Sequence, residues 1–292
     1  MRPVLRLFGL ICLVVAAALW FLSRPISLPI DAMAGLTGNA EKGEAVFWAG
    51  GCASCHAAPG STGDAYLILS GGYRIESPFG TFLSPNISPG PKGIAGWTTQ
   101  DLANALIAGV SPKGQHLYPS LPYTTYVRMK LQDVVDLKAF LDGLPASDTD
   151  SLPHELAFPF TIRRGLGLWK RLNMSSDWHL DTVETPEVDR GRYLVEALGH
   201  CAECHTPRNI VGGLDRTRWM QGAPNPSGKG SIPSISPDKL TWSTGDIAYY
   251  LETGFTPEYD SAGGQMAKVI AGMEHLSPED RMAIAHYLTA LP

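Results

Sequence analysis

The chain has 292 residues, of which 44% are hydrophobic and 17% charged, so it is long enough for two domains and too apolar for a disordered protein. Its formal net charge is −5 and it contains no block of Lys and Arg, so the sequence gives no support for nucleic acid as a partner. The 31 glycines and 23 prolines indicate long loops between short helices.

The N-terminal segment is an apolar stretch of the kind that enters a membrane. Residues 7–22 carry no charge, and residues 4–22 reach the length of a span if Arg6 extends to the interface. A signal peptide would be cleaved just after this run, where the sequence reads Trp20-Phe-Leu-Ser-Arg-Pro; the better pattern, Ala32-Met-Ala34, lies too far along. We therefore expect an uncleaved transmembrane anchor at 4–22 in preference to a signal peptide, and either would export the rest of the chain.

Two five-residue motifs of the form Cys-x-x-Cys-His dominate the remaining sequence. They are Cys52-Ala-Ser-Cys55-His56 and Cys201-Ala-Glu-Cys204-His205. This is the attachment signature of c-type haem. Residues i, i+3 and i+4 of a helical turn share a face, so two thiols can bond the vinyl groups of one porphyrin while the histidine ligates its iron. The sequence therefore predicts two covalently bound haem c groups, each with one histidine ligand.

Two other functions use paired cysteines. Four cysteines can form a zinc site, and one pair can form a thioredoxin-like dithiol. Against zinc, a histidine directly follows each pair, and the pairs lie near the starts of two similar segments. Against the dithiol, neither pair follows a strand in a βαβ pattern. The fifth cysteine, Cys12, lies in the apolar N-terminus, so no thiols remain for a disulfide framework.

From about Gly38 onwards the sequence repeats itself. Cys52 and Cys201 are 149 residues apart, Ile87-Ser-Pro recurs at Ile235 with an offset of 148, and the other matching positions have offsets of 145 to 147. Such a constant offset indicates one duplicated domain. We expect domains at residues 38–145 and 189–292, joined by a linker at 146–188.

Each repeat has the sequence pattern of a short helical domain. A helix leads into the haem motif, a loop rich in Gly and Pro follows, and a Thr98-x-x-Asp101 or Ser243-x-x-Asp246 capping pattern begins the next helix. A final helix closes each unit, and no alternating strand pattern of any length appears. The linker contains a mixed apolar and basic segment at 158–172, for which we favour an ordered strap across both domains over a membrane or partner contact.

The sixth iron ligand decides between electron transfer and catalysis, since methionine closes the iron and raises its potential. In the second repeat Met266 lies before the final helix, with Met273 as the second choice. In the first repeat the corresponding methionine is Met129, with His116 or an open iron as alternatives.

The chain resembles the dihaem c-type cytochrome subunits of membrane-bound periplasmic alcohol, gluconate and aldehyde dehydrogenases. The resemblance spans residues 38–292, and the segments that carry it include Ser84-Pro-Asn-Ile-Ser-Pro89, Gly114-Gln-His-Leu-Tyr-Pro119 and His200-Cys-Ala-Glu-Cys-His-Thr-Pro-Arg-Asn209. It implies a mainly α structure of two tandem class I cytochrome c folds behind a membrane anchor. Several relatives have methionine where this chain has Leu121, and many have three haem units where this chain has two.

These observations predict an electron carrier, not an enzyme. We expect it to lie at the bacterial inner membrane with its haem domains in the periplasm, to accept electrons from a periplasmic dehydrogenase, and to pass them to a quinone, another cytochrome or a terminal oxidase of the respiratory chain. The alternative is a dihaem peroxidase-like or thiosulfate-oxidising enzyme with one open or differently ligated iron. Arg208 would pair with a haem propionate or a partner carboxylate, or have no role.

Overall fold

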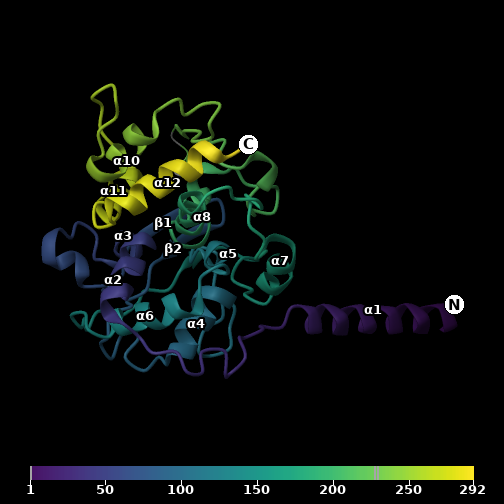
Figure 1. Ribbon diagram of the computed structural model, residues 1–292. Coiled ribbons are helices and arrows are strands. Elements are labelled where there is room, and N and C mark those ends of the chain that lie inside the picture. Colours follow the sequence, from purple (N-terminus) through teal and green to yellow (C-terminus); the bar gives the residue numbers. More distant parts are fainter. Residues whose placement is uncertain (1, 227, 229) are drawn as a thin grey trace.

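A single straight helix, α1 (Arg2–Leu22), projects away from the rest of the molecule, with the N-terminus at its far end (Figure 1). The computed structural model describes residues 2–226, 228 and 230–292. The segment Pro3–Leu22 has a mean hydropathy of 2.4 and none of it is buried, so its length and composition suit a membrane span. The predicted apolar helix is therefore present, in a form compatible with an anchor or a signal.

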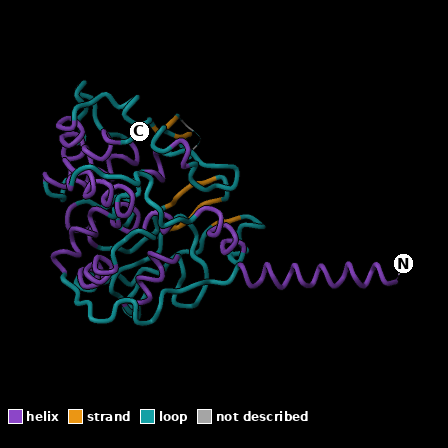
Figure 2. Tube along the Cα trace, turned by 45° about the vertical axis from the view of Figure 1, so that its right-hand side comes forward, coloured by secondary structure: helices purple, strands orange, loops and turns teal. Residues whose placement is uncertain are grey.

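The body of the molecule consists of two helical halves with a similar order of elements (Figures 1 and 2). The first half contains α2 (Ala40–Ala49), α3 (Cys52–His56), η1 (Gly63–Leu67), α4 (Thr99–Ala108), α5 (Tyr123–Tyr126) and α6 (Leu131–Leu141). The second contains α8 (Pro186–Tyr193), η2 (Leu194–Leu198), α9 (Ala202–His205), η3 (Arg216–Arg218), α10 (Thr244–Thr253), α11 (Gly264–Met273) and α12 (Pro278–Ala290). In this second half, α8 and its continuation η2 together correspond to α2. The mainly helical prediction is confirmed.

The local signals that start and stop the middle helices act as the sequence predicts. Thr98 caps α4 and Ser243 caps α10, and in both cases an aspartate three residues on completes a reciprocal capping box. Both helices end at a glycine in the left-handed conformation, Gly109 with φ 61° and Gly254 with φ 75°. Both halves therefore begin and end the corresponding helix, α4 or α10, with the same kinds of cap.

The first and last helices of each half cross at a glycine. Gly43 of α2 meets α6, and a Cβ at this position would overlap the carbonyl of Asp136. Gly191 of α8 meets α12, and a Cβ there would overlap the carbonyl of Ala283. Only glycine permits so close an approach of two helix backbones, so these two positions set the packing of both halves.

The structure also contains short strands that the sequence did not predict. Strands β1 (Arg74–Ser77) and β2 (Gly80–Leu83) form a tight hairpin, to which β3 (Glu155–Leu156) from the linker adds. A second hairpin pairs β4 (Ala223–Pro224) with β5 (Ser231–Ile232). Strands of two to four residues are too short to show an alternating hydrophobic pattern, which is why they were missed.

The linker is an ordered strap that contacts both halves, as expected. It contains α7 (Gly165–Asn173), a helix that forms in spite of two glycines. The buried Lys170 Nζ donates hydrogen bonds to the carbonyls of Ala108 (2.7 Å) and Gly109 (2.6 Å) in the first half. On the other side, Trp169 Nε1 donates to the carbonyl of Val211 (2.8 Å) in the second half. Tertiary contacts thus override the weak helix propensity of this segment.

A buried carboxylate holds the end of the linker against the second half. Glu196, only 1% exposed, accepts hydrogen bonds from the backbone N–H of His179 (2.5 Å) and Leu180 (3.2 Å) and from the hydroxyl of Tyr287 (2.8 Å). These three hydrogen bonds offset the free-energy cost of removing the carboxylate of Glu196 from water.

We predict that Gly43→Ala and Gly191→Ala each destabilise the haem-loaded protein by about 1 to 3 kcal/mol, because the added methyl forces two helices apart. Gly245→Ala in α10 is the matched control, since the nearest atom to its Cβ would be the Ser243 hydroxyl at 3.6 Å. It should be neutral or stabilising by up to about 1 kcal/mol. Denaturant unfolding measures all three, and equal stability of the three variants would contradict the close-approach argument.

We also predict that Glu196→Ala costs at least about 3 kcal/mol, because two buried N–H groups and one hydroxyl lose their acceptor. Glu196→Gln keeps one acceptor oxygen and should lose less. The exposed Glu184 provides the control, for which Glu184→Ala should stay within about 0.5 kcal/mol of the parent. Thermal unfolding of the haem-loaded proteins ranks the stability of the three variants. A Glu196→Ala protein as stable as Glu184→Ala would refute the role of the carboxylate.

Candidate functional site

The two predicted histidine ligands are held in the same way. Nδ1 of His56 lies 2.8 Å from the carbonyl oxygen of Pro85, and Nδ1 of His205 lies 2.8 Å from that of Pro233. Burial lowers the pKa of both imidazoles, which favours the neutral ring. Since a carbonyl can only accept, Nδ1 carries the proton in each ring and Nε2 keeps its lone pair for a metal.

The loop that supplies each proline carbonyl is itself bound to the histidine backbone. The N–H of Gly71 donates to the carbonyl of His56 (2.7 Å), and the N–H of Gly222 donates to that of His205 (2.7 Å). Both glycines have positive φ, 76° and 80°, and a Cβ on either would overlap the proline-bearing loop. Each histidine is therefore fixed at its ring and at its carbonyl.

The four motif cysteines differ in exposure, because Cys204 is exposed whereas Cys52, Cys55 and Cys201 are half-buried. Burial raises the pKa of Cys52 and of Cys201 to about 12, and it also raises the pKa of Cys55 and Cys204. Within residues 2–226, 228 and 230–292, no group of three or more His, Cys, Asp or Glu side chains is arranged to hold a metal ion. The structure therefore gives no support to the four-cysteine zinc site.

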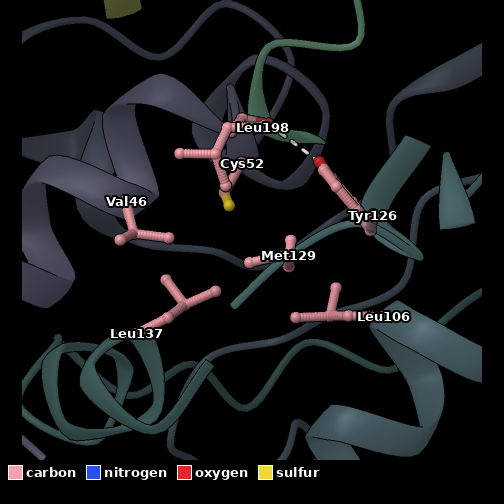
Figure 3. A pocket seen from close by; sticks show the side chains of 8 residues that line it. Val46, Cys52, Leu106, Tyr126, Met129, Leu137 and Leu198 are labelled. Atoms are coloured by element: carbon pink, nitrogen blue, oxygen red, sulfur yellow. Dashed lines mark hydrogen bonds between the residues drawn. The ribbon is translucent and has the colours of Figure 1, made fainter. Parts of the chain in front are cut away.

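A small apolar pocket adjoins the first motif. Figure 3 shows the sulfur of Cys52 pointing into the space between Val46 of α2, Leu137 of α6 and Met129. The hydroxyl of Tyr126, at the edge of the pocket, donates to the carbonyl of Gly50 (2.9 Å), shown as the dashed line. Helices from three parts of the first half thus surround one attachment thiol with hydrocarbon.

The second half repeats this apolar lining. Its residues at the corresponding positions are all buried: Leu194 (2% exposed), Leu251 (8%), Leu276 (7%) and Ile284 (4%). A neutral imidazole with free Nε2, two thiols on the same turn and an apolar surround are the donor set and environment of covalent haem. The residues of both halves therefore fit the group that the motifs imply.

The predicted methionine ligands lie at different positions in the repeat. Matching backbone hydrogen bonds, Leu117 N to Gly109 O and Ala262 N to Gly254 O, fix an offset of 145 residues between the two halves. With this offset Leu121 occupies the position of Met266, and each N–H donates to the carbonyl three residues earlier at 3.1 Å. Met266 is half-buried at the start of α11, not on a loop as expected.

Met129 directly precedes the residue that caps α6, just as Leu276 precedes the residue that caps α12. Both side chains are 7% exposed and pack in the core. Met129 as the sixth ligand therefore stays a prediction. The alternative ligand, His116, is buried and its Nε2 lies 2.8 Å from the carbonyl of Ser23, so that nitrogen is already engaged.

The first motif lies at the contact between the two halves. The hydroxyl of Ser54, inside the first motif, donates to the carbonyl of Lys268 in α11 (3.1 Å). The ammonium of Lys268 lies 3.5 Å from the centre of the Tyr73 ring, and Trp48 stacks on His275 with ring centroids 3.7 Å apart. The helix that carries Met266 therefore packs directly on the first haem motif.

Sequence reasoning missed several site residues. Pro85 and Pro233 recur with the offset of 148 that also relates Ile87 to Ile235, so the register could have identified them. Arg208 pairs with Glu203 (2.6 Å) inside the second half and also donates to the carbonyl of Gly212 (3.1 Å), and its pairing with a haem propionate or a partner carboxylate stays a prediction.

Comparison with known proteins agrees with this site. The cytochrome c family model matches residues 40–145. A diheme c-type cytochrome of Cereibacter sphaeroides is 57% identical over 285 residues, 97% of this chain and 96% of that protein. The cytochrome subunit of fructose dehydrogenase from Gluconobacter japonicus is 34% identical over 258 residues, 86% of this chain and 52% of its own length.

The cytochrome c subunit of a quinone-dependent alcohol dehydrogenase from Gluconobacter oxydans is 33% identical over 267 residues, 86% of this chain and 54% of that subunit. This chain therefore spans almost the whole of the diheme cytochrome and about half of each dehydrogenase subunit. The identity over nearly the full length, together with the paired motifs and their fixed histidines, shows that the chain belongs to the cytochrome c family.

Proposed function

We propose that this protein is a dihaem c-type cytochrome that passes electrons from a periplasmic dehydrogenase to the respiratory chain. The observation that carries the proposal is the pair of identical histidine sites, each on a Cys-x-x-Cys-His turn with Nδ1 bonded to a proline carbonyl, in two halves that contact each other. When bound, haem c supplies an iron that exchanges one electron.

The halves would be two tandem class I cytochrome c domains, residues 38–145 and 189–292, behind an anchor at 4–22 in the bacterial inner membrane. The repeated helix order and the two glycine crossings at Gly43 and Gly191 support this division. Ser23, which directly follows α1, is only 4% exposed, which supports retention of the anchor because cleavage at Ala32-Met-Ala34 would remove this packed residue.

In the proposed function the four motif cysteines bind two haem c groups covalently, His56 and His205 are the proximal ligands, and Met129 and Met266 are the sixth ligands. The proline carbonyls hold the imidazoles in one orientation, and the apolar linings exclude water from the iron. A site that changes little between oxidation states exchanges electrons with a small reorganisation cost. The Ser54 to Lys268 contact brings the two halves together for transfer between haems.

The relatives named as dehydrogenase cytochrome subunits support a dehydrogenase as electron donor. The acceptor would be a quinone, another cytochrome or a terminal oxidase.

To test the proposed electron donor, protein purified from native membranes in mild detergent is given a panel of alcohols, aldehydes and sugar acids, and haem reduction is followed optically. Reduction of both haems by one substrate, with co-purification of a dehydrogenase subunit, is the expected result. If no substrate reduces either haem of the protein purified from native membranes, the proposed donor is contradicted.

One observation favours a second candidate function. Leu121 stands at the position of Met266, so the first half lacks sulfur where the second half has it. If Met129 does not bind iron, the first site is open, and a dihaem peroxidase-like or thiosulfate-oxidising activity becomes the better proposal. Carbon monoxide separates the two functions, because an iron with two protein ligands resists it and an open iron binds it.

We predict that the reduced parent protein does not bind carbon monoxide, and that Met266→Leu makes one haem bind it. Met273→Leu is the matched control, since Met273 lies on the same helix, is 4% exposed and should only fill the core. Optical titration measures the fraction of haem that responds. Binding by Met273→Leu and not by Met266→Leu would transfer the ligand role to Met273.

We predict that Met129→Leu opens the other haem in the same way, so that the double variant with Met266→Leu binds two equivalents of carbon monoxide. The matched change is Leu276→Met in the second half, which places a sulfur at the corresponding position and should leave carbon monoxide binding as in the parent. Binding of one equivalent by the parent protein, unaltered by Met129→Leu, would exclude Met129 and support the second function.

A further inference from the structure

We infer that α1 is clamped in a fixed direction on α7, and that this clamp lays one face of the protein on the lipid headgroups of an anionic membrane. The inference rests on the proposed retention of residues 4–22 as a membrane anchor. The face, called here the membrane face, consists of exposed apolar side chains of the strap and of a neighbouring loop: Phe158, Phe160, Ile162, Leu172, Ile210 and Val211.

Arginines of the strap bind the end of the anchor helix. The last carbonyls of any helix lack partners within the helix. Here Arg164 donates to the carbonyl of Trp20 (2.5 Å) and to the hydroxyl of Ser23 (2.9 Å), and Arg171 donates to the carbonyl of Leu22 (2.7 Å). Cationic donors at a helix C-terminus also interact favourably with its dipole. The strap thus supplies the cap that the anchor lacks.

The junction is packed as well as bonded. The carbonyl of Ser23 accepts a hydrogen bond from His116 Nε2 (2.8 Å), and Ser23 itself lies against Gly167 of α7. A Cβ at Gly167 would overlap the carbonyl oxygen of Ser23, so this glycine is what lets the two backbones meet. A few residues on, the N–H of Leu28 donates to Asn104 (2.8 Å). The anchor is therefore seated on the first half and is not a flexible tether.

The end of α1 has the side chains of a membrane interface. The guanidinium of Arg164 lies 4.2 Å from the centre of the Trp20 ring, and that of Arg24 lies 4.2 Å from the Phe21 ring. Aromatic and cationic residues gather where hydrocarbon meets headgroups. The last turn of α1 thus marks the level of the membrane surface, and α7 lies at this level beside it (Figure 1).

The exposed apolar residues adjoin this level. Phe158 is 80% exposed and Leu172 is 77% exposed, at the two ends of the strap. The loop at 209–213 is tied to α7 by Trp169 Nε1 to the carbonyl of Val211 (2.8 Å) and by Asn209 Nδ2 to Asn173 (3.0 Å). Its tip, Ile210, is fully exposed. Insertion of exposed apolar side chains into the headgroup region of a membrane is favourable, because it removes apolar surface from water.

Charge favours an anionic lipid as the occupant. Residues 157–173 contain four basic side chains, Arg163, Arg164, Lys170 and Arg171, and no acidic one, although the whole chain has a net charge of −5. Basic residues beside a span are attracted to acidic headgroups. Lys170 is buried, and Arg164 and Arg171 bind the end of α1, so the strap combines its hold on the anchor with a local excess of basic side chains beside the membrane surface.

To test this inference, the haem-loaded full-length chain is placed in lipid nanodiscs of phosphatidylcholine with or without phosphatidylglycerol, containing a phospholipid with a photoreactive headgroup. Crosslinked peptides are then mapped by mass spectrometry. Crosslinks are expected in 158–172 and 209–213, more strongly with phosphatidylglycerol. The internal control is the apolar patch around Tyr259, which is 94% exposed and lies outside the membrane face, so it should crosslink only at background.

The matched variants are Gly167→Ala and Gly165→Ala. Gly167→Ala should lower crosslinking of the membrane face while the anchor still spans, whereas a Cβ at Gly165 would meet no atom within 4 Å and should change nothing. Unchanged haem absorbance and far-ultraviolet circular dichroism at the temperature of the experiment confirm that both variants fold.

Crosslinking of the membrane face no stronger than at Tyr259 would overturn the inference, and so would crosslinks that appear only with a dehydrogenase subunit present. Failure of the anchor itself gives a different result: an intact mass that lacks residues 1–22, with no protein retained in the nanodiscs. The two failures are therefore distinguishable.

Discussion

The hydrogen bond from an imidazole Nδ1 to a proline carbonyl is the constraint on which both sites depend. It fixes the tautomer of His56 and His205 and turns Nε2 away from the bond, toward the side where a metal can bind. To supply the carbonyl, a loop must fold back on the motif, and Gly71 and Gly222 allow this because they have positive φ and approach the loop too closely for a Cβ. The long Gly- and Pro-rich loops of the sequence are therefore the part of the chain that holds the histidines.

The two halves share this proximal side but differ on the opposite side of the site. The second half has Met266 on a full helix, α11, whereas the first has Leu121 followed by the four-residue α5. The identity of the sixth ligand and the access of solvent both set the potential of a haem iron. In the proposed function, two sites built on one plan would therefore have different reduction potentials, which would set the direction of transfer between them.

The sequence predicted those features that have a local cause. The caps at Thr98 and Ser243, the paired motifs and the repeat offset are each visible within a few residues, and the structure contains all of them at the expected positions. It did not predict α7, because two glycines argue against a helix unless the packing of Gly167 on Ser23 is known. It placed Met266 on a loop because a methionine ligand usually lies on the loop before the last helix, whereas here α11 begins at Gly264 and packs on α2, α3 and α10.

Burial of the attachment thiols has a consequence for how the protein matures. A thiol forms a bond most readily when it is exposed and close to ionisation. In the folded chain Cys52 and Cys201 are protonated, with pKa values raised to about 12, and Ser54 between the first pair is bonded to the opposite half. In the proposed function, an open chain would therefore offer these thiols to haem more readily than the folded chain, and attachment would precede the contact between the halves.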